Sequence, residues 1–210
     1  LEVVRSLKVA YPEANWVQGI ELRALAALGR EAELRDLFEV YYQDRNPLRT
    51  RIGAELSAHG FADLAHRIDV DGLAALDAVP REERDDDWKY NRALVISDLL
   101  GLSAAIDQID EIERQSPRWL DSRAARGNWA AQQGDSVLAL QIIQELEAIP
   151  QSGYRWHTQA RIAATLGEKE RAVSLLRRMT SPVRGVMHRE ALFPTLVGYE
   201  PFEELERPRG

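Results

Sequence analysis

Glycine and proline recur along this chain of 210 residues with one shared period, and that period restricts the fold more than any other feature. The mean spacing of six prolines is 34 residues. These prolines are Pro12, Pro47, Pro80, Pro117, Pro150 and Pro182. One glycine of a second series falls within each interval, namely Gly29, Gly60, Gly101, Gly134 and Gly167. Self-similarity at a period of roughly 20–50 residues is typical of repeat proteins.

Aligning the copies on these glycines places apolar and small residues in columns. Eight residues after the glycine the residue is always aliphatic: Leu37, Ile68, Ile109, Ile142 and Leu175. Seven residues before it stand Leu22, Gly53, Leu94, Gly127 and Ala160. On both sides of each glycine the apolar residues recur at steps of three and four, which indicates helices and not strands.

Each copy is therefore predicted to be two helices joined at a glycine and followed by a proline. Glycine supplies the left-handed conformation that ends the first helix. Proline cannot continue the second helix. Because a lone hairpin would leave one apolar face in water, the copies must stack on one another. The pattern predicts an all-α solenoid.

The copies at 120–150 and 154–182 resemble the tetratricopeptide repeat family. The residues that carry the resemblance are Gly127, Gly134, Ala139, Pro150, Trp156 and Ala172. The resemblance extends over about residues 1–182 and implies a right-handed α-α superhelix of about five helical hairpins.

The predicted organisation is a single solenoid over residues 1–210. A half-repeat at 1–12 precedes repeats at 13–47, 48–80, 88–117, 120–150 and 153–182, with an insertion loop at 81–87 and a C-terminal cap at 183–210. Apolar residues of the cap are predicted to cover the last hairpin, namely Leu192, Phe193, Leu196, Phe202 and Leu205.

The last 23 residues, HREALFPTLVGYEPFEELERPRG, resemble the ending of bacterial multidomain proteins with tetratricopeptide repeats. In such proteins the solenoid commonly lies downstream of a kinase or DNA-binding domain. The chain opens LEVVRSLKVAYP, with no methionine and no signal-peptide core. We therefore expect a fragment of a longer bacterial signalling or regulatory protein.

Charge and composition disfavour several classes of partner. The formal net charge is −7, whereas a nucleic-acid surface needs positive potential. An anionic membrane surface is disfavoured for the same reason. No apolar run approaches the ~18–20 residues that cross a bilayer. We expect a soluble segment, either cytoplasmic or an extracytoplasmic part of a membrane-anchored parent protein.

Acidic clusters are the first candidates for metal or acid/base chemistry. Asp85–Asp87 are consecutive, so they cannot all point at one ion without an unusual loop. Asp69, Asp71 and Gly72 begin like a calcium loop, but its remaining ligands do not follow. Asp107, Asp110 and Glu111 lie on a predicted helix at one-turn spacing, which a charged outer face explains.

Other catalytic motifs do not occur in the sequence. The four histidines, His59, His66, His157 and His188, include no His-Glu-x-x-His pair. There are no cysteines, no phosphate-binding glycine loop and no G-x-S-x-G elbow. We therefore predict a protein that is not an enzyme and that needs no cofactor or metal.

The family resemblance implies a concave groove lined by the first helix of each hairpin. The candidate binding residues are Trp16, Arg23, Trp88, Asn91, Asp98, Asn128, Gln132, Tyr154, His157 and Arg161. Asparagine can bond both the N–H and the C=O of an extended peptide, and arginine can hold a carboxylate. Aromatic side chains supply anchors in the centre of an interface. His157 is predicted to lie on the groove wall, as a contact or a pH-sensitive switch.

An alternative for Trp16, Trp88 and Tyr154 is that they begin helices and pack between repeats. The family's two-carboxylate clamp is only partly matched, by Asn128 and Arg161, because no lysine stands in that column. The leading hypothesis for function is a scaffold that binds a protein or peptide segment in the groove. The alternatives are a homodimerisation or spacer module and, less favoured, an RNA-binding helical repeat or an enzyme.

Overall fold

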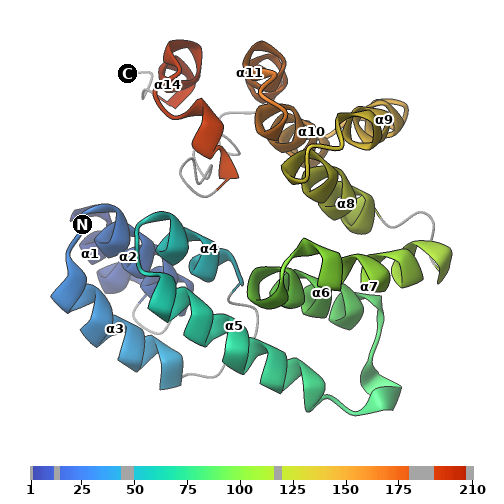
Figure 1. Ribbon diagram of the computed structural model, residues 1–210. Helices are drawn as coiled ribbons and strands as arrows, with labels where there is room; N and C mark the ends of the chain where they lie inside the picture. The colour runs from blue at the N-terminus through green and yellow to red at the C-terminus, as the bar shows by residue number, and fades with distance from the viewer. Residues whose placement is uncertain (1, 12–14, 44–49, 116–119, 180–191, 207–210) are drawn as a thin grey trace. The chain divides into compact units, whose positions relative to one another are not determined.

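The computed structural model describes residues 2–11, 15–43, 50–115, 120–179 and 192–206. Within these ranges every regular element is helical, which confirms the all-α prediction (Figure 1). The chain separates into two compact units, Leu1–Gly101 and Leu102–Gly210. Each unit has a hydrophobic core of its own.

Unit 1 contains six α-helices and one 3-10 helix in its described residues. In chain order they are α1 (Glu2–Ala10), α2 (Asn15–Ala27), α3 (Glu31–Gln43), α4 (Thr50–Ala58), α5 (Ala62–Asp77), η1 (Arg81–Glu83) and α6 (Asp86–Leu100). Helices α2 and α3 pack as one hairpin, and α4 and α5 pack as the next. Helix α4 also contacts α2, and α6 contacts α5.

Unit 2 begins with α7 (Leu102–Gln115) and continues with two hairpins and a C-terminal segment. The further elements are α8 (Leu120–Gln132), α9 (Ser136–Glu147), α10 (Gly153–Thr165), α11 (Lys169–Arg177), η2 (Pro194–Leu196) and α14 (Glu200–Glu206). Helices α8 and α9 form one hairpin, and α10 and α11 form the other. Helix α10 also packs on α8 and α9.

Four of the five turn glycines stand inside the hairpins α2–α3, α4–α5, α8–α9 and α10–α11, as the sequence predicts, and the fifth, Gly101, is the last residue of unit 1. Their φ angles lie between 63° and 91°, in the left-handed region that a side chain disfavours. At Gly134 the glycine N–H bonds to Ala131 O at 3.1 Å and the next N–H bonds to Ala130 O at 2.9 Å. The turns at Gly29, Gly60 and Gly167 have the same two hydrogen bonds, which satisfy the last carbonyls of the first helix. The turn at Gly101, where unit 1 ends, differs: its N–H bonds to Ser97 O.

The core of unit 1 lies between its two hairpins, where Leu22, Leu34 and Leu56 are fully buried. On the outside, exposed ion pairs join α3 to α5. Arg35 pairs with Asp63 at 2.7 Å, and Arg67 pairs with Glu39 at 2.5 Å. Both pairs join residues 28 positions apart, so the second helices of these two hairpins run in the same direction. Exposed pairs of this kind contribute only about 0–1 kcal/mol each.

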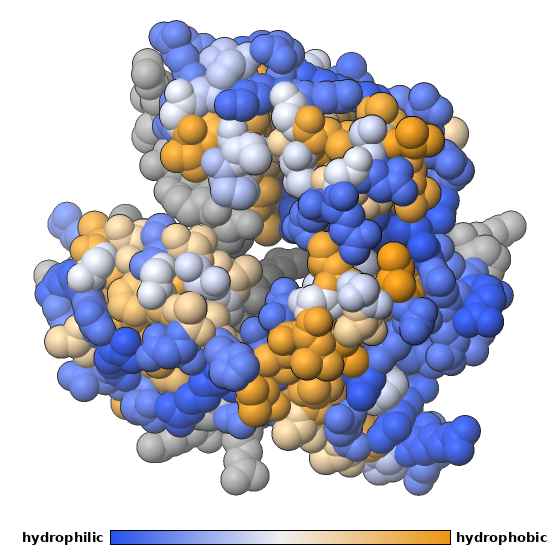
Figure 2. Space-filling view, viewed as in Figure 1, coloured by the Kyte–Doolittle hydropathy of each residue, from blue (hydrophilic) through white to orange (hydrophobic). Residues whose placement is uncertain are grey.

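The core of unit 2 lies between α8, α9, α10 and α11 and takes in the C-terminal segment. Phe193, Leu196 and Phe202 are fully buried in it, and the rings of Phe193 and Phe202 lie 5.8 Å apart. The apolar residues assigned to the cap therefore pack on the α10–α11 hairpin. On the face shown in Figure 2, hydrophilic side chains cover most of the surface and apolar ones gather in smaller patches.

Gly127 permits a close approach of α8 to its neighbours. A Cβ at this position would lie 2.5 Å from Ile162 Cδ1 on α10 and 2.9 Å from Ile142 Cγ2 on α9. Both distances are shorter than any ordinary carbon–carbon contact, so glycine is required here for packing and not for backbone conformation. Position 53, in the same column of the repeat, has room for a methyl group, because its nearest neighbour would be Asp69 Oδ1 at 3.6 Å.

Candidate functional site

Equivalent positions of successive first helices adjoin in unit 2. Asp121 on α8 and Tyr154 on α10 both stand thirteen residues before their turn glycine. The Tyr154 hydroxyl donates a hydrogen bond to Asp121 Oδ1. Ser152 caps α10 by accepting from the Arg155 N–H, which fixes the start of the helix one residue before Tyr154. Tyr154 remains 49% exposed.

We name the residues of this surface the α8–α10 face: Asp121, Asn128, Gln132, Tyr154, His157 and Arg161. Gln132 is exposed, and His157 and Arg161 are half-buried. Asn128 is only 8% exposed, and its side-chain amide donates to Ala124 O at 3.1 Å within its own helix. Asn128 therefore offers little surface to a ligand, whereas Tyr154, Gln132 and Arg161 offer more.

The C-terminal segment borders this face at His157. The His157 ring meets the Phe193 ring edge-on, with centroids 5.3 Å apart and planes at 83°. Two turns further along α10, the Thr195 hydroxyl donates to Ala164 O at 2.8 Å. Residues 193–195 thus lie against the same side of α10 that carries His157. An aromatic edge contact of this kind holds the imidazole in one orientation.

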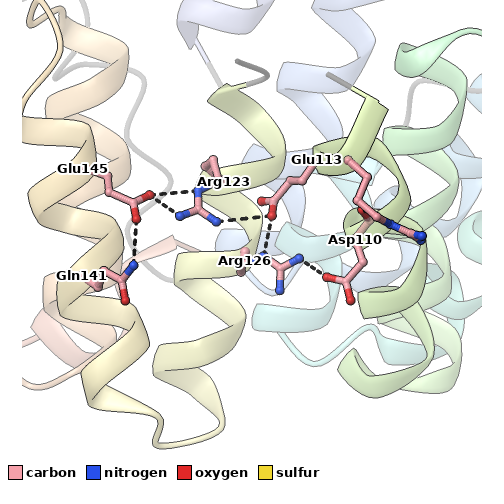
Figure 3. Close-up of polar contacts among 7 residues, drawn as sticks. Asp110, Glu113, Arg123, Arg126, Gln141 and Glu145 are labelled. Carbon is pink, nitrogen blue, oxygen red and sulfur yellow. Dashed lines mark hydrogen bonds and ion pairs between the residues drawn. The ribbon is translucent and has the colours of Figure 1, made fainter. Parts of the chain in front are cut away.

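Ion pairs link α7, α8 and α9 beside the face (Figure 3). Arg126 donates to Glu113 Oε2 at 2.9 Å and also to Asp110. Arg123 reaches Glu113 at 3.3 Å and Glu145 at 3.0 Å, so the two arginines share Glu113 between them. We name these five residues the interhelical network.

The network favours the charged forms of Arg123 and Glu145. Partial burial disfavours the charge on Arg123, but Glu145 and Glu113 outweigh burial and raise the pKa of Arg123. Burial likewise acts against the charge on Glu145, yet Arg123 and Gln141 lower the pKa of that carboxyl. Asp110 forms an ion pair with Arg126. In the sequence it was one of a set of closely spaced carboxylates. Its contact joins two helices, so Asp110 has a structural partner in place of a proton-transfer partner.

Trp88 in unit 1 contacts neighbouring residues of its own unit, from α5, from the insertion and from α6. Its indole N–H donates to Leu76 O at 2.7 Å. Its ring lies between two guanidinium groups, those of Arg84 at 4.5 Å and Arg92 at 5.7 Å from the centroid. Asp85 caps α6 by accepting from the Trp88 N–H at 2.8 Å. These contacts favour the alternative in which Trp88 begins a helix and packs internally.

The remaining candidates of unit 1 lie apart from that cluster. Arg23 donates to Gly19 O at 3.2 Å within its own helix, and Asn91 is half-buried. Asp98 is exposed near the end of α6. Trp16 begins α2, but its side chain lies outside the described residues.

Metal-binding side chains do not gather anywhere in the described ranges: no group of three histidine or acidic residues is placed to hold an ion. Asp69 and Asp71 lie within helix α5, which is not the loop that calcium ligands need. His59 lies 3.8 Å from Glu55 at the end of α4. His188 lies outside the described residues.

Two acidic residues have contacts in the structure that the sequence did not assign to them. Asp121 stands in the same repeat column as Tyr154, so the column itself is the signal that identifies it. Asp69 stands nine residues after its turn glycine, where three other copies carry Phe38, Ile143 and Leu176, all fully buried. An acidic residue in a column that is apolar in most copies is the signal that identifies it.

Comparison of the chain with protein-family models, with curated proteins and with solved structures gave no match. In the ranges that the structure covers, none of the helices combines the length and the apolar character needed to cross a membrane.

Proposed function

We propose that this chain is a protein-interaction module of the tetratricopeptide type, which binds a segment of a partner protein along its first helices. The five hairpins would form one right-handed superhelix, and the α8–α10 face would be part of its groove. The hydrogen bond from Tyr154 to Asp121 carries the proposal, because it joins equivalent positions of two successive first helices. A ligand lying across these helices would meet the same repeat position twice.

The chemistry of the face suits a peptide segment. Tyr154, at 49% exposure, supplies a large ring with a polar end, which is typical of interface anchors. Arg161 supplies donors for a carboxylate or a backbone carbonyl, and Gln132 supplies both a donor and an acceptor. The interhelical network joins α8 to α7 and α9, and the core of unit 2 holds α8 against α10, so the two helices that carry these side chains are fixed.

The test is selection of binding peptides from a phage-displayed random library, followed by affinity measurement on variants of the chain. Tyr154→Ala and Arg161→Ala are expected to weaken a selected peptide at least tenfold each. Arg177→Ala is the matched control, because Arg177 is an exposed basic residue on the second helix α11. Equal affinity of all three variants and the parent chain would refute the assignment of the groove.

Self-association is the second candidate function, and one observation favours it. Two large apolar side chains at the end of α1 lie in solvent: Val9 is 85% exposed and Tyr11 is 53% exposed. Light scattering at two concentrations tests it. A mass of one chain at both concentrations, about 23.8 kDa, would remove this candidate.

A further inference from the structure

Helices α5 and α6 pack in opposite directions, and their register is fixed at two points. Asp77 near the end of α5 pairs with Arg92 on α6 at 2.7 Å. Five residues earlier on α5, a Cβ at Gly72 would lie 4.0 Å from Val95 Cγ2, three residues further along α6. Lower residue numbers on α5 therefore lie opposite higher residue numbers on α6, as in an antiparallel pair.

The next step of this register places two carboxylates opposite each other. Asp69 precedes Gly72 by one helical turn, and Asp98 follows Val95 by one turn. Asp69 is 7% exposed, and its Oδ1 is buried without a hydrogen-bond partner. Asp98 is exposed, so the pair opens to solvent on the side of α6. The pair at Asp77 and Arg92 attracts, whereas the pair at Asp69 and Asp98 repels.

Basic side chains near the two carboxylates are engaged elsewhere. On α6, Arg92 pairs with Asp77, and Lys89 lies 3.7 Å from Asp86. From α3, Arg35 and Glu39 meet α5 through Asp63 and Arg67.

Helix α4 presents Gly53 to Asp69, and this residue carries no charge. From α6, the charged group that faces Asp69 is Asp98.

Both carboxyls respond to this setting. Burial, and then the charge of Asp98, raise the pKa of Asp69 to about 7. Loss of surrounding water raises the pKa of Asp98 to about 6. Asp98 is exposed, so solvent screens part of its charge, whereas the enclosed Asp69 Oδ1 has no hydrogen-bond donor within the described ranges.

We propose that Asp69 and Asp98 form a binding site for a primary ammonium group, the lysine side chain of a partner segment. An ammonium between the two carboxylates would donate to both and remove the repulsion between them. A divalent metal is a poorer fit, because calcium takes six to eight oxygen ligands and the described residues supply two carboxylates here. The ammonium is a compact point charge on a slim stem, so it needs less room beside the two carboxylates than a planar guanidinium does.

This site goes beyond the proposed function, because it lies in unit 1 and does not depend on the α8–α10 face. Its affinity depends on pH in one direction. The cation binds the ionised carboxylates, so binding tightens as the pH rises through 6 and 7. Below these pKa values the affinity falls about tenfold for each pH unit per proton released.

The experiment is an NMR titration of the whole chain with Nα-acetyl-lysine methylamide, following the side-chain carboxyl carbons of Asp69 and Asp98. The neutral control probe is the same compound acetylated at Nε. We expect saturable shifts with the charged probe at pH 8, none with the neutral probe, and binding at least tenfold weaker at pH 5. Asp69→Asn abolishes the response, and Asp71→Asn, at an exposed position of α5, is the matched control that preserves it.

Shifts of equal size with the neutral probe, or in Asp69→Asn, would overturn the site. If a variant does not fold, the pKa of Asp69 is measured in the parent chain with and without the charged probe. Bound ammonium must lower this pKa, because it stabilises the ionised carboxylate. An unchanged pKa at saturating probe would contradict the proposal. Tyr154→Ala leaves these results unchanged, which separates failure of this site from failure of the α8–α10 face.

Discussion

The same substitution at two equivalent glycines is predicted to change stability in opposite directions. Gly53 on α4 and Gly127 on α8 both stand seven residues before a turn glycine, and both lie inside helices. Replacing either by alanine adds one methyl group and raises helix propensity by the same amount. The two variants therefore differ only in what the methyl group meets.

The surrounding atoms set the two magnitudes. At position 53 the new methyl lies 3.6 Å from Asp69 Oδ1 and 3.9 Å from Ile68 Cγ2, which are ordinary contacts. Alanine there is expected to raise the free energy of unfolding by about 0.5–1 kcal/mol, through helix propensity alone. At position 127 the methyl lies 2.5 Å and 2.9 Å from two fully buried isoleucines. Overpacking of this kind costs about 1–3 kcal/mol, so a net loss of about 1–2 kcal/mol is expected.

The assay is urea denaturation of the parent chain and the two variants, followed by far-ultraviolet circular dichroism at 25 °C. Because the glycines lie in different units, amide hydrogen exchange is measured in parallel to assign each change to its own unit. Gly127→Ala is expected to speed exchange in α8, α9 and α10. Gly53→Ala is expected to slow exchange in α4 and α5.

Equal shifts in both variants would refute the reasoning, since they would mean that the methyl group meets the same surroundings at both positions. A Gly127→Ala chain as stable as the parent chain would also refute it. That result would show that α8 does not approach α9 and α10 as closely as the Ile142 and Ile162 distances require.

Three further predictions concern charge and core packing. The pKa of Asp69 is raised from 3.8 to about 7, so the native state holds this proton more tightly than the unfolded chain does. In denaturation curves, the stability of the parent chain relative to Asp69→Asn is therefore expected to fall as the pH rises from 4 to 7, by at most about 4 kcal/mol. Arg126→Met is expected to lower the free energy of unfolding in urea by about 2 kcal/mol, because the Arg126 side chain is 14% exposed and contacts two carboxylates. The control Arg67→Met, at an exposed ion pair, is expected to lower it by only about 0–1 kcal/mol. Phe193→Ala, at a fully buried position, is expected to cost about 3–5 kcal/mol in unit 2, read from thermal melts and from the His157 ring resonances.

Local rules predicted the four hairpins α2–α3, α4–α5, α8–α9 and α10–α11, because helix termini are decided by nearby residues. The turn glycines, the cap residue Asp135 of α9 and the aliphatic column all act within a few residues of themselves. Apolar residues such as Phe193 were predicted to be covered because a half-repeat must bury one side. Nothing non-local was needed for these inferences.

The site residues were harder to predict, because their roles depend on which helix lies opposite. Trp88 is an aromatic at a helix start, and only the fold of residues 76–84 brings Leu76 O and Arg84 to it. The opposition of Asp69 and Asp98 arises from the register of α5 against α6, which appears in the Asp77–Arg92 pair and in the contact of Gly72 with Val95. A repeat column gives a residue its position on one helix but not the partner it meets on the next.

The most direct test of binding along the first helices is a map of amide chemical-shift changes on the whole chain when a selected peptide is added. We predict that the largest changes fall in residues 121–132 and 153–165, on the first helices α8 and α10. Changes confined to the second helices, in residues 136–147 and 169–177, would contradict the central claim that partner segments bind along the first helices.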